Sequence, residues 1–385
     1  MTVKFRVVIT IPCLLLGGTE VQTLNLVRAL VSGNYQITVF CYYEYDNNMV
    51  DSYRAAGAEV ILMKLDRSRG LLHLVRKLKN ILQQTKPDIV HVQYMAPGFI
   101  PIIVARLCGI RTVFATVHQP GRTHGLKAKV LLRTAALFCT AFFCVSQAAE
   151  TSWFGSSAVF DARKYRKARR KHFTIYNSID FSSVKERIKK TDRTSLKKSL
   201  GLDKCLIVGS VGRFREEKGQ GVLIRAMANV VHIFPEACLL LVGDGPDREK
   251  LQKLSEELNL HNYIHWVGQL DPEAVIAYYN IMDLAVVPSR FEGFGLAAVE
   301  AMAAGLPVLA SKVDGLCEVI EHEKTGYLIP PENSNLLADH IIVLLTDLDK
   351  AAGMGRAGRK RVEQYFSMEQ FSDAILTVYK SYRNS

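Results

Sequence analysis

Two series of short apolar runs, alternating with amphipathic stretches, constrain the fold of this chain more than any other feature. In the first series, strands are predicted at Arg6–Thr10, Ile37–Cys41, Val60–Met63, Ile89–Gln93, Thr112–Thr116 and Ala141–Val145. In the second, they are predicted at Leu206–Val211, Cys238–Val242, Leu284–Val287, Val308–Ala310 and Tyr327–Ile329. Helical periodicity fills the gaps, so the pattern predicts two parallel sheets with helices on both faces.

The length of 385 residues is comfortable for two domains of this kind. We predict an α/β protein with Rossmann-like domains at 1–180 and 205–367. Residues 181–204, rich in Lys, Ser and Thr, are predicted as a linker, and a helix within 368–385 is predicted to pack back on the first domain. Ligands of open α/β sheets bind beyond the carboxyl ends of the strands, so active residues are expected directly after strands.

Charge is divided unevenly between the two halves. Residues 1–180 hold 24 Lys and Arg against 10 Asp and Glu, whereas residues 181–385 hold 25 against 27. A basic first half favours an anionic partner. The run Arg163–Lys171 has seven cations in nine residues. It is either a solvated face or a contact with anionic lipid headgroups, which an amphipathic helix could extend through Arg122, Lys127, Lys129 and Arg133. No nucleic-acid partner is expected, because no known module or aromatic platform is recognisable.

Cysteine usage and hydropathy bear on the compartment. The eight cysteines are scattered without a Cys-x-x-Cys pair, which favours a reducing cytoplasm. The longest apolar stretch, Ala135–Val145, is too short to span a bilayer and is predicted to be a helix end followed by a buried strand. The start of the chain lacks the pattern of a signal peptide. We therefore expect a cytoplasmic protein whose membrane contact, if any, is peripheral.

Two glutamates eight positions apart, Glu292 and Glu300, follow the predicted strand Leu284–Val287. The helix between them begins near Gly295 and Leu296, and its free N–H groups form an anion site suited to phosphate. Two carboxylates beside an anion site would repel the ligand unless they bind hydroxyl groups. A ribose and a hexose joined by a diphosphate supply both kinds of group.

Two further strand ends carry matching chemistry. Arg213 and Lys218 flank a turn after Leu206–Val211, and a guanidinium plus an ammonium suits a diphosphate. Gly243, after Cys238–Val242, lets a ligand approach the backbone closely.

The Glu-x7-Glu spacing in its Glu-Gly-Phe-Gly setting resembles the signature of family 4 retaining glycosyltransferases, which have the GT-B fold of two Rossmann-like domains facing across a cleft. The resemblance implies that Arg213 and Lys218 hold the donor diphosphate. It implies that Glu292 contacts sugar hydroxyls and Glu300 the ribose, with the N–H groups near Gly295 and Leu296 on phosphate or sugar. Gly243 would line the nucleotide pocket and the backbone of Val267 would read the base, whereas Trp266 is predicted to be core.

The same resemblance extends to the first domain. Gly17 and Gly18 match the glycine loop that lies close to the donor phosphate and sugar. His118, after Thr112–Thr116, matches a histidine that points at the donor sugar. Gln119 follows where many relatives have Asp, so a role of that carboxylate is lost. The predicted catalytic set is therefore His118, Glu292, Arg213 and Lys218.

The predicted activity is transfer of a hexose from a nucleotide-diphosphate sugar, with UDP favoured, to an acceptor hydroxyl with retention of configuration. The acceptor is expected to be a glycan or a lipid-linked molecule of bacterial surface polysaccharide or glycolipid synthesis. No metal and no other cofactor are expected, because GT-B enzymes generally work without a bound metal. Three alternatives are weighed: a sugar-nucleotide hydrolase or epimerase of the same fold, a phosphorylase, for which no cofactor lysine or inorganic phosphate signature is recognisable, and a non-catalytic protein that binds nucleotide sugars.

Overall fold

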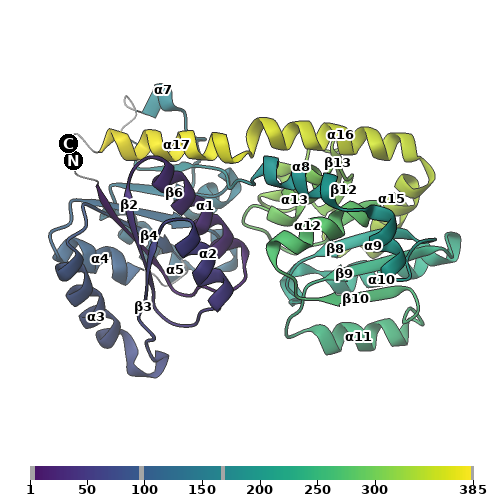
Figure 1. Cartoon of the computed structure of the whole chain (residues 1–385), viewed down its shortest axis with the longest axis horizontal. Coiled ribbons are helices and arrows are strands. Elements are labelled where there is room, and N and C mark those ends of the chain that lie inside the picture. Colours follow the sequence, from purple (N-terminus) through teal and green to yellow (C-terminus); the bar gives the residue numbers. More distant parts are fainter. Residues whose placement is uncertain (1–4, 95–98, 166–169, 383–385) are drawn as a thin grey trace. The chain divides into compact units, whose positions relative to one another are not determined.

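The structure, a computed structural model, describes residues 5–94, 99–165 and 170–382. It divides into two compact units (Figure 1). The first comprises Met1–Ser178 together with Met368–Ser385, and the second comprises Ile179–Ser367. Each unit is built on its own parallel sheet.

The sheet of the first unit has seven strands in the order β3-β2-β1-β4-β5-β6-β7. Its strands are β1 (Arg6–Ile11), β2 (Gln36–Cys41), β3 (Glu59–Leu62), β4 (Ile89–Tyr94), β5 (Thr112–Val117), β6 (Ala141–Cys144) and β7 (His172–Thr174). Its helices are α1 (Gly18–Ser32), α2 (Asn47–Ala55), α3 (Gly70–Thr85), α4 (Phe99–Leu107), α5 (Leu126–Leu137), α6 (Gln147–Phe154), α7 (Ala162–Tyr165) and α17 (Met368–Ser381). The 3-10 turns are η1 (Arg67–Arg69) and η2 (Gly121–Thr123).

Alternation along the strands gives this sheet two apolar faces. On one face Val7 and Ile9 join a core with residues of α1, α2 and α17. On the other Val8 joins a core with residues of α3, α4 and α5. The C-terminal helix α17 packs against α1 and buries Phe371 and Tyr379 in the first of these cores.

The sheet of the second unit has six strands in the order β10-β9-β8-β11-β12-β13. Its strands are β8 (Leu206–Val211), β9 (Ala237–Val242), β10 (Ile264–Gly268), β11 (Leu284–Val287), β12 (Val308–Ser311) and β13 (Gly326–Ile329). Its helices are α8 (Phe181–Lys190), α9 (Arg193–Ser199), α10 (Gln220–Ile233), α11 (Arg248–Glu257), α12 (Pro272–Ile281), α13 (Leu296–Ala304), α14 (Leu316–Val319), α15 (Ser334–Thr346) and α16 (Leu348–Tyr365), and η3 (Glu216–Lys218) is a 3-10 turn.

The predicted linker 181–204 is wrong, because α8 and α9 occupy most of it and belong to the second unit. Each helix starts at an aspartate, Asp180 or Asp192, whose side chain accepts from backbone N–H groups of the first turn. Arg193 then ties α9 to the unit through Asp283 (2.6 Å) and the Asn280 carbonyl (2.8 Å). The polar composition that suggested a linker is the exposed face of capped helices.

Two short strands, β7 and β10, were not predicted. The first has only three residues and directly follows the cation run, and the second is an edge strand with an irregular register. In the stretch 135–145 helix α5 ends at Leu137 and the buried strand β6 follows, which confirms the prediction for that segment. None of the eight cysteines, which all lie in the described residues, forms a disulfide bond. Within the described ranges no helix combines the length and the apolar character needed to cross a bilayer.

Candidate active site

Lys218 and Glu292 meet at the carboxyl ends of β8 and β11, as their positions after strands predicted they could. Lys218 Nζ lies 2.6 Å from Glu292 Oε2, and both side chains are at least two-thirds covered. The Ser289 hydroxyl donates to the same carboxylate oxygen at 3.3 Å. The backbone N–H of Glu292 donates to Asp314 Oδ2 at 3.3 Å. The carboxylate of Glu292 is therefore oriented from two sides before any ligand is bound.

The turn that carries Lys218 is held against the turn that carries Glu292. Gly219 has a φ of 70°, and a Cβ at this position would lie 2.0 Å from the Pro288 carbonyl oxygen. Only glycine allows that approach. Arg290 completes the connection, because its backbone N–H donates to the Glu217 carbonyl at 2.8 Å and its guanidinium pairs with Glu216.

Helix α13 begins at this same place without a side-chain cap. Gly295 is left-handed (φ 104°, ψ 53°), and the helix starts at Leu296. The N-terminus thus leaves backbone donors and the positive end of the helix dipole beside Glu292. It matches the anion site expected from the sequence.

Glu300 lies further along α13, and the pKa of its carboxyl is raised to about 7. Burial is the larger effect and raises the pKa, and a hydrogen bond from Tyr279 partly offsets it. The Tyr279 hydroxyl is 3.0 Å from Glu300 Oε2 and 3.2 Å from the Ala297 carbonyl oxygen. Burial, and then the neighbouring Glu300, hold the pKa of Tyr279 well above its ordinary value, so it stays a donor. Further hydroxyl groups that donate to Glu300 would lower its pKa and favour the ionised carboxylate.

The ends of β8, β9 and β10 form a close-packed floor. Gly243 has a φ of 133°, and a Cβ there would lie 2.1 Å from the Gly212 carbonyl oxygen. Gly243 N–H donates to the Gly268 carbonyl at 2.8 Å. The register of β10 against β9 shifts between Trp266 and Gly268, so Val267 has no partner in that register.

The other predicted residues of this unit take two different roles. Arg213 is exposed after β8, and its carbonyl accepts from the Gln220 amide at 3.1 Å. Trp266 is partly buried, packs edge-on against buried Phe214 with ring centroids 5.7 Å apart, and lies against the core, in line with the structural role predicted for it.

In the first unit His118 Nε2 lies 2.8 Å from Gln93 Oε1. The amide oxygen can only accept, so Nε2 carries the proton and Nδ1 keeps its lone pair. Burial lowers the pKa of His118 to about 4, so the ring is neutral near pH 7. Gln93 Nε2 is buried without a hydrogen-bond partner among the described residues. The side chains of Gln93 and His118 line a small cavity, together with His91 and Thr116.

The glycine loop of the first unit opens α1, whose N-cap is Gly17 in an extended conformation and whose first residue is Gly18. At the end of the first unit the sequence has Asn177-Ser178 where the family has Asn-Gly. Ser178 is buried and exchanges two hydrogen bonds with the Gln22 side chain, at 2.7 and 2.9 Å. It is absent from the described residues with positive φ, so this turn does not require glycine.

Among the predicted site residues that the structure describes, Lys218 and Glu292 form an ion pair, and the others of the second unit lie on neighbouring strand ends and on α13. Sequence reasoning missed the partners that orient them: Tyr279, Ser289, Asp314 and Gln93. The separation of 21 residues between Tyr279 and Glu300, and of 25 between Gln93 and His118, carries no local signal.

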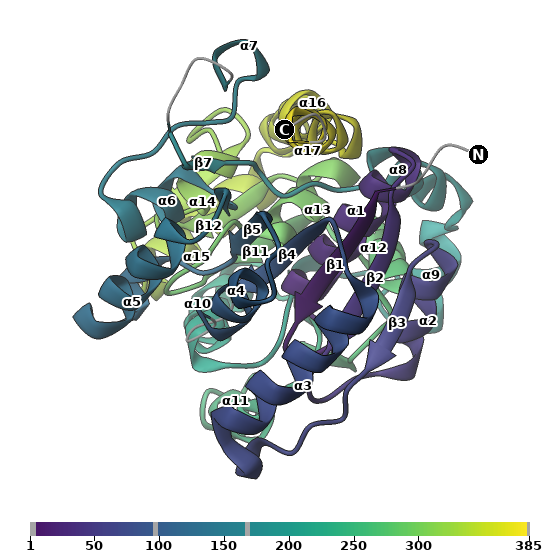
Figure 2. The same cartoon turned by 90° about the vertical axis from the view of Figure 1, so that its left-hand side faces the viewer.

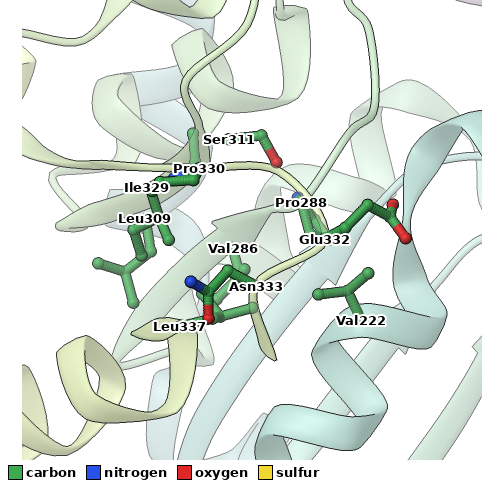
Figure 3. A pocket seen from close by; sticks show the side chains of 11 residues that line it. Val222, Val286, Pro288, Leu309, Ser311, Ile329, Pro330, Glu332, Asn333 and Leu337 are labelled. Atoms are coloured by element: carbon green, nitrogen blue, oxygen red, sulfur yellow. The ribbon is translucent and has the colours of Figure 1, made fainter. Parts of the chain in front are cut away.

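A hollow in the second unit lies at the carboxyl ends of β11, β12 and β13 (Figure 3). It is lined mainly by apolar side chains, among them Val222, Leu309 and Ile329. Two of its three polar members have structural partners, because Glu332 pairs with Arg290 and Asn333 caps α15. None of the predicted donor residues lines it.

Metal ligands are a separate question. The described residues contain no group of three or more His, Cys, Asp or Glu side chains arranged to hold an ion. An Asp-x-Asp spacing does occur, at Asp347 and Asp349, but the Asp347 side chain caps α16 by accepting from Lys350 N at 2.9 Å. Metal-free activity stays a prediction.

Comparison with known proteins places this arrangement in a family. Residues 16–182 match the family described as Glycosyltransferase Family 4, and residues 192–361 match Glycosyl transferases group 1. The chain is 31% identical over 313 residues to N-acetyl-alpha-D-glucosaminyl L-malate synthase of Bacillus anthracis, covering 80% of this chain and 78% of that protein.

The chain belongs to glycosyltransferase family 4. A second relative, an uncharacterized glycosyltransferase of Methanocaldococcus jannaschii, is 25% identical over 96% of this chain and 95% of its own.

Solved structures confirm the fold. Anabaena HepE, crystallised with UDP and glucose, has a TM-score of 0.81 at 21% identity and covers 98% of this chain, which covers 100% of HepE. Sucrose-phosphate synthase from Thermosynechococcus elongatus has a TM-score of 0.78 at 22% identity, over 99% of this chain and 100% of its own. The family 4 chain thus has the predicted GT-B architecture of two α/β units and is a glycosyltransferase.

Proposed function

We propose that this family 4 glycosyltransferase moves a hexose from a UDP-sugar to an acceptor hydroxyl with retention of anomeric configuration. The observation that carries the proposal is the second unit's cluster of an uncapped helix N-terminus, the Lys218–Glu292 pair and the half-buried Glu300, whose pKa is raised. These groups match the three parts of a nucleotide-diphosphate sugar.

The diphosphate would lie at the N-terminus of α13, between Lys218 and Arg213. In the ligand-free chain Glu292 already neutralises Lys218. A phosphate would share that ammonium group and add the exposed guanidinium of Arg213. Two cations and a helix end offset the charge that develops on the leaving diphosphate, the role that a metal ion fills in other transferases.

The sugar and the ribose would be bound by the two glutamates. Glu292, fixed by Ser289 and Lys218, accepts from sugar hydroxyls. Neutral His118 offers the lone pair of Nδ1 to another sugar hydroxyl. Glu300 accepts from the ribose hydroxyls and, next to the bulge, the backbone of Val267 contacts the base. Gly243 lines the nucleotide pocket. The backbone of Gly17, Gly18, Gly295 and Leu296 lies close to the phosphates or the sugar.

The chemical step is hypothesised as a front-face reaction. The acceptor oxygen attacks the anomeric carbon as the bond from that carbon to the β-phosphate oxygen breaks. The departing phosphate takes the acceptor's proton, so no enzyme nucleophile is required. Two cations that stabilise the leaving group would supply most of the acceleration.

The names of relatives support a nucleotide-sugar donor and leave GDP as the alternative to UDP. The solved HepE complex contains UDP and glucose. A relative from Mycobacterium tuberculosis, 32% identical over 44% of this chain and 46% of its own, is named a GDP-mannose-dependent mannosyltransferase acting on phosphatidylinositol monomannoside. UDP is our choice, and GDP is the outcome that would replace it.

For the acceptor we propose a glycan or a lipid-linked molecule of a bacterial surface pathway, reached from the cytoplasm by a peripherally bound enzyme. The basic run Arg163–Lys171 was the predicted membrane contact, but 166–169 lie outside the described residues. Arg170, which is described, pairs with buried Glu150 at 2.9 Å and is a structural cation. The run therefore contributes less free charge than its sequence indicates.

Thermal stabilisation across UDP, GDP, ADP and their sugars tests the proposal, with wild type beside Glu300→Ala. We expect one nucleotide to stabilise the wild type and to lose that effect in the variant. If none of these nucleotides stabilises the wild type, the proposed donor site is contradicted. Binding followed by donor loss without acceptor would identify a hydrolase, and binding without turnover a non-catalytic protein.

A further inference from the structure

Helix α5 presents an apolar ridge to solvent on the side opposite its core contacts. Leu126, Val130 and Leu137 are 77%, 58% and 70% exposed. At about 100° per residue these three lie within an arc of about 40° along about 16 Å of helix. The buried residues Leu132 and Ala135 lie on the opposite side and join the core beneath the sheet. The ridge is therefore surplus to folding of the unit.

The ridge continues beyond the helix. Leu107, the last residue of α4, is 76% exposed, and Phe138, directly after α5, is 44% exposed. Arg106 Nε donates to the Phe138 carbonyl at 2.6 Å, which places the end of α4 beside the end of α5. Figure 2 shows α5 beside α4 in the helix layer of the first unit, with α3 on the other side of α4. Exposed apolar side chains that gather on one face are typical of surfaces that meet a partner or a membrane.

Cations border the ridge on both sides. In the same helical projection Lys129 and Arg133 lie on one flank and Lys127 on the other. The surrounding sequence from Ile89 to Ala149 contains six Lys and Arg and no Asp or Glu. An apolar ridge between basic flanks matches the boundary between acyl chains and anionic headgroups.

We propose that α5 docks this glycosyltransferase on an anionic lipid surface, with Leu126, Val130 and Leu137 inserted among the acyl chains. Lys127 and Lys129 then lie at the level of the headgroups. This surface differs from the Arg163–Lys171 run, because exposed apolar side chains that can insert and basic side chains lie together on one described helix. It also stands independently of the donor chemistry, because no residue of the proposed active site belongs to it.

A second copy of the chain is the competing occupant, and the charge pattern disfavours it. Two such faces brought together would oppose cations to cations with no acid nearby to pair them. One exposed helix face is also small beside the area of about 800 Å² that each partner contributes to a stable interface.

Flotation with vesicles, without nucleotide, tests the proposal. The probes are phosphatidylcholine vesicles with and without phosphatidylglycerol. We expect wild type to float with the anionic vesicles and to be released in part at about 1 M salt, where charges are screened beyond about 3 Å. Leu126→Gln with Val130→Gln and Leu137→Gln should lower partitioning about tenfold or more, because insertion scales with buried apolar area.

A matched triple variant on the second unit provides the control. Ile233, Val343 and Leu348 are 55%, 40% and 61% exposed on helices, and changing them to Gln should leave flotation unchanged. Lys127→Gln with Lys129→Gln, which spares every apolar side chain, should weaken binding to anionic vesicles alone.

Three outcomes would overturn docking by α5: no flotation of wild type, equal loss in both triple variants, or a concentration-dependent dimer that the α5 triple variant abolishes. Circular dichroism and the thermal midpoint check that each variant folds, and the lysine pair keeps the test decisive if the α5 triple variant does not. Since no nucleotide is present, failure here leaves the proposed transfer untouched, and loss of nucleotide stabilisation leaves docking untouched.

Discussion

The two units share an architecture and differ in how their strand ends carry charge. In the second unit the end of β11 leads to an ion pair, Lys218–Glu292, and to a carboxyl, Glu300, that burial leaves only partly ionised near pH 7. In the first unit the end of β5 leads to His118, a neutral imidazole that is hydrogen-bonded to the neutral side-chain amide of Gln93. Charge is thus concentrated in the second unit, where a diphosphate and a ribose are expected to bind, whereas the end of β5 in the first unit carries uncharged groups.

The largest effect is expected for the cations that face the diphosphate. Arg213→Ala should lower kcat/KM by about 100-fold to 1000-fold, because a group that stabilises the leaving charge is lost. Steady-state kinetics with the identified donor measures this. Arg215→Ala is the matched control, an exposed arginine two positions away whose pairing with Glu217 is loose, at 3.8 Å. A fall of less than tenfold for Arg213→Ala would defeat the charge argument.

A second prediction separates binding from stability at Glu300. Its pKa is about 7 in the folded chain against an ordinary 4.5, so its contribution to stability is present below about 4.5 and lost as pH rises through about 7. Glu300→Gln should therefore raise the free energy of unfolding at pH 8 by about 2 kcal/mol. The same change should weaken nucleotide binding about 30-fold, because ribose hydroxyls lose a charged acceptor.

Calorimetry and thermal unfolding of wild type and Glu300→Gln measure both effects. In wild type, nucleotide affinity should rise with pH up to about 7, with proton release on binding, because the hydroxyl donors favour the ionised carboxylate. A variant that loses stability and affinity together would assign Glu300 a structural role. Tyr279→Phe, which removes the donor but keeps the carboxyl, should shift the affinity profile to higher pH.

The first unit offers a smaller and different effect. Gln93→Met removes the acceptor that fixes the tautomer of His118 and should lower kcat/KM about tenfold. Thermal stability should change little, since the Gln93 amide nitrogen is already unsatisfied. Gln93→Glu restores an acceptor and should recover activity at high pH while raising the pKa of His118. If Gln93→Met and Gln93→Glu behave alike across pH, orientation of His118 by residue 93 is excluded.

The smallest effect contrasts the two units directly. Between pH 7.5 and 5.5 protonation of Glu300 stabilises the second unit. Burial holds the pKa of His91 near 3 and that of His118 near 4, so their contribution is full above about 6.5 and falls as pH drops. Hydrogen exchange, corrected for intrinsic rates, should show the first unit losing stability relative to the second.

His265 opposes this trend in the second unit, because burial lowers its pKa as well. Glu300→Gln isolates the carboxyl, since it should remove the stabilisation by acid in the second unit and leave the first unit unchanged. Parallel loss in both units of wild type, unchanged by the variant, would contradict the contrast.

Much of this architecture was predictable because parallel strands have strong local signals. The strands Leu206–Val211 and Leu284–Val287 and the helix Leu296–Ala304 have the bounds that periodicity predicted. A residue that follows such a strand must lie at the carboxyl edge of the sheet, which is why Lys218 and Glu292 could be placed near each other before the structure was known.

The tertiary structure decided what spacing cannot express. Only packing shows that Phe181–Ser199 forms helices of the second unit, that Gln93 holds His118, and that Tyr279 bonds Glu300. Burial sets the pKa of Glu300, and burial is a property of neighbours distant in sequence. The exposed ridge of α5 is of the same kind, because only the fold shows that Leu132 and Ala135 are buried and that Leu126 and Leu137 are exposed. Sequence determines which chemistry a strand end carries, whereas the fold determines what surrounds it.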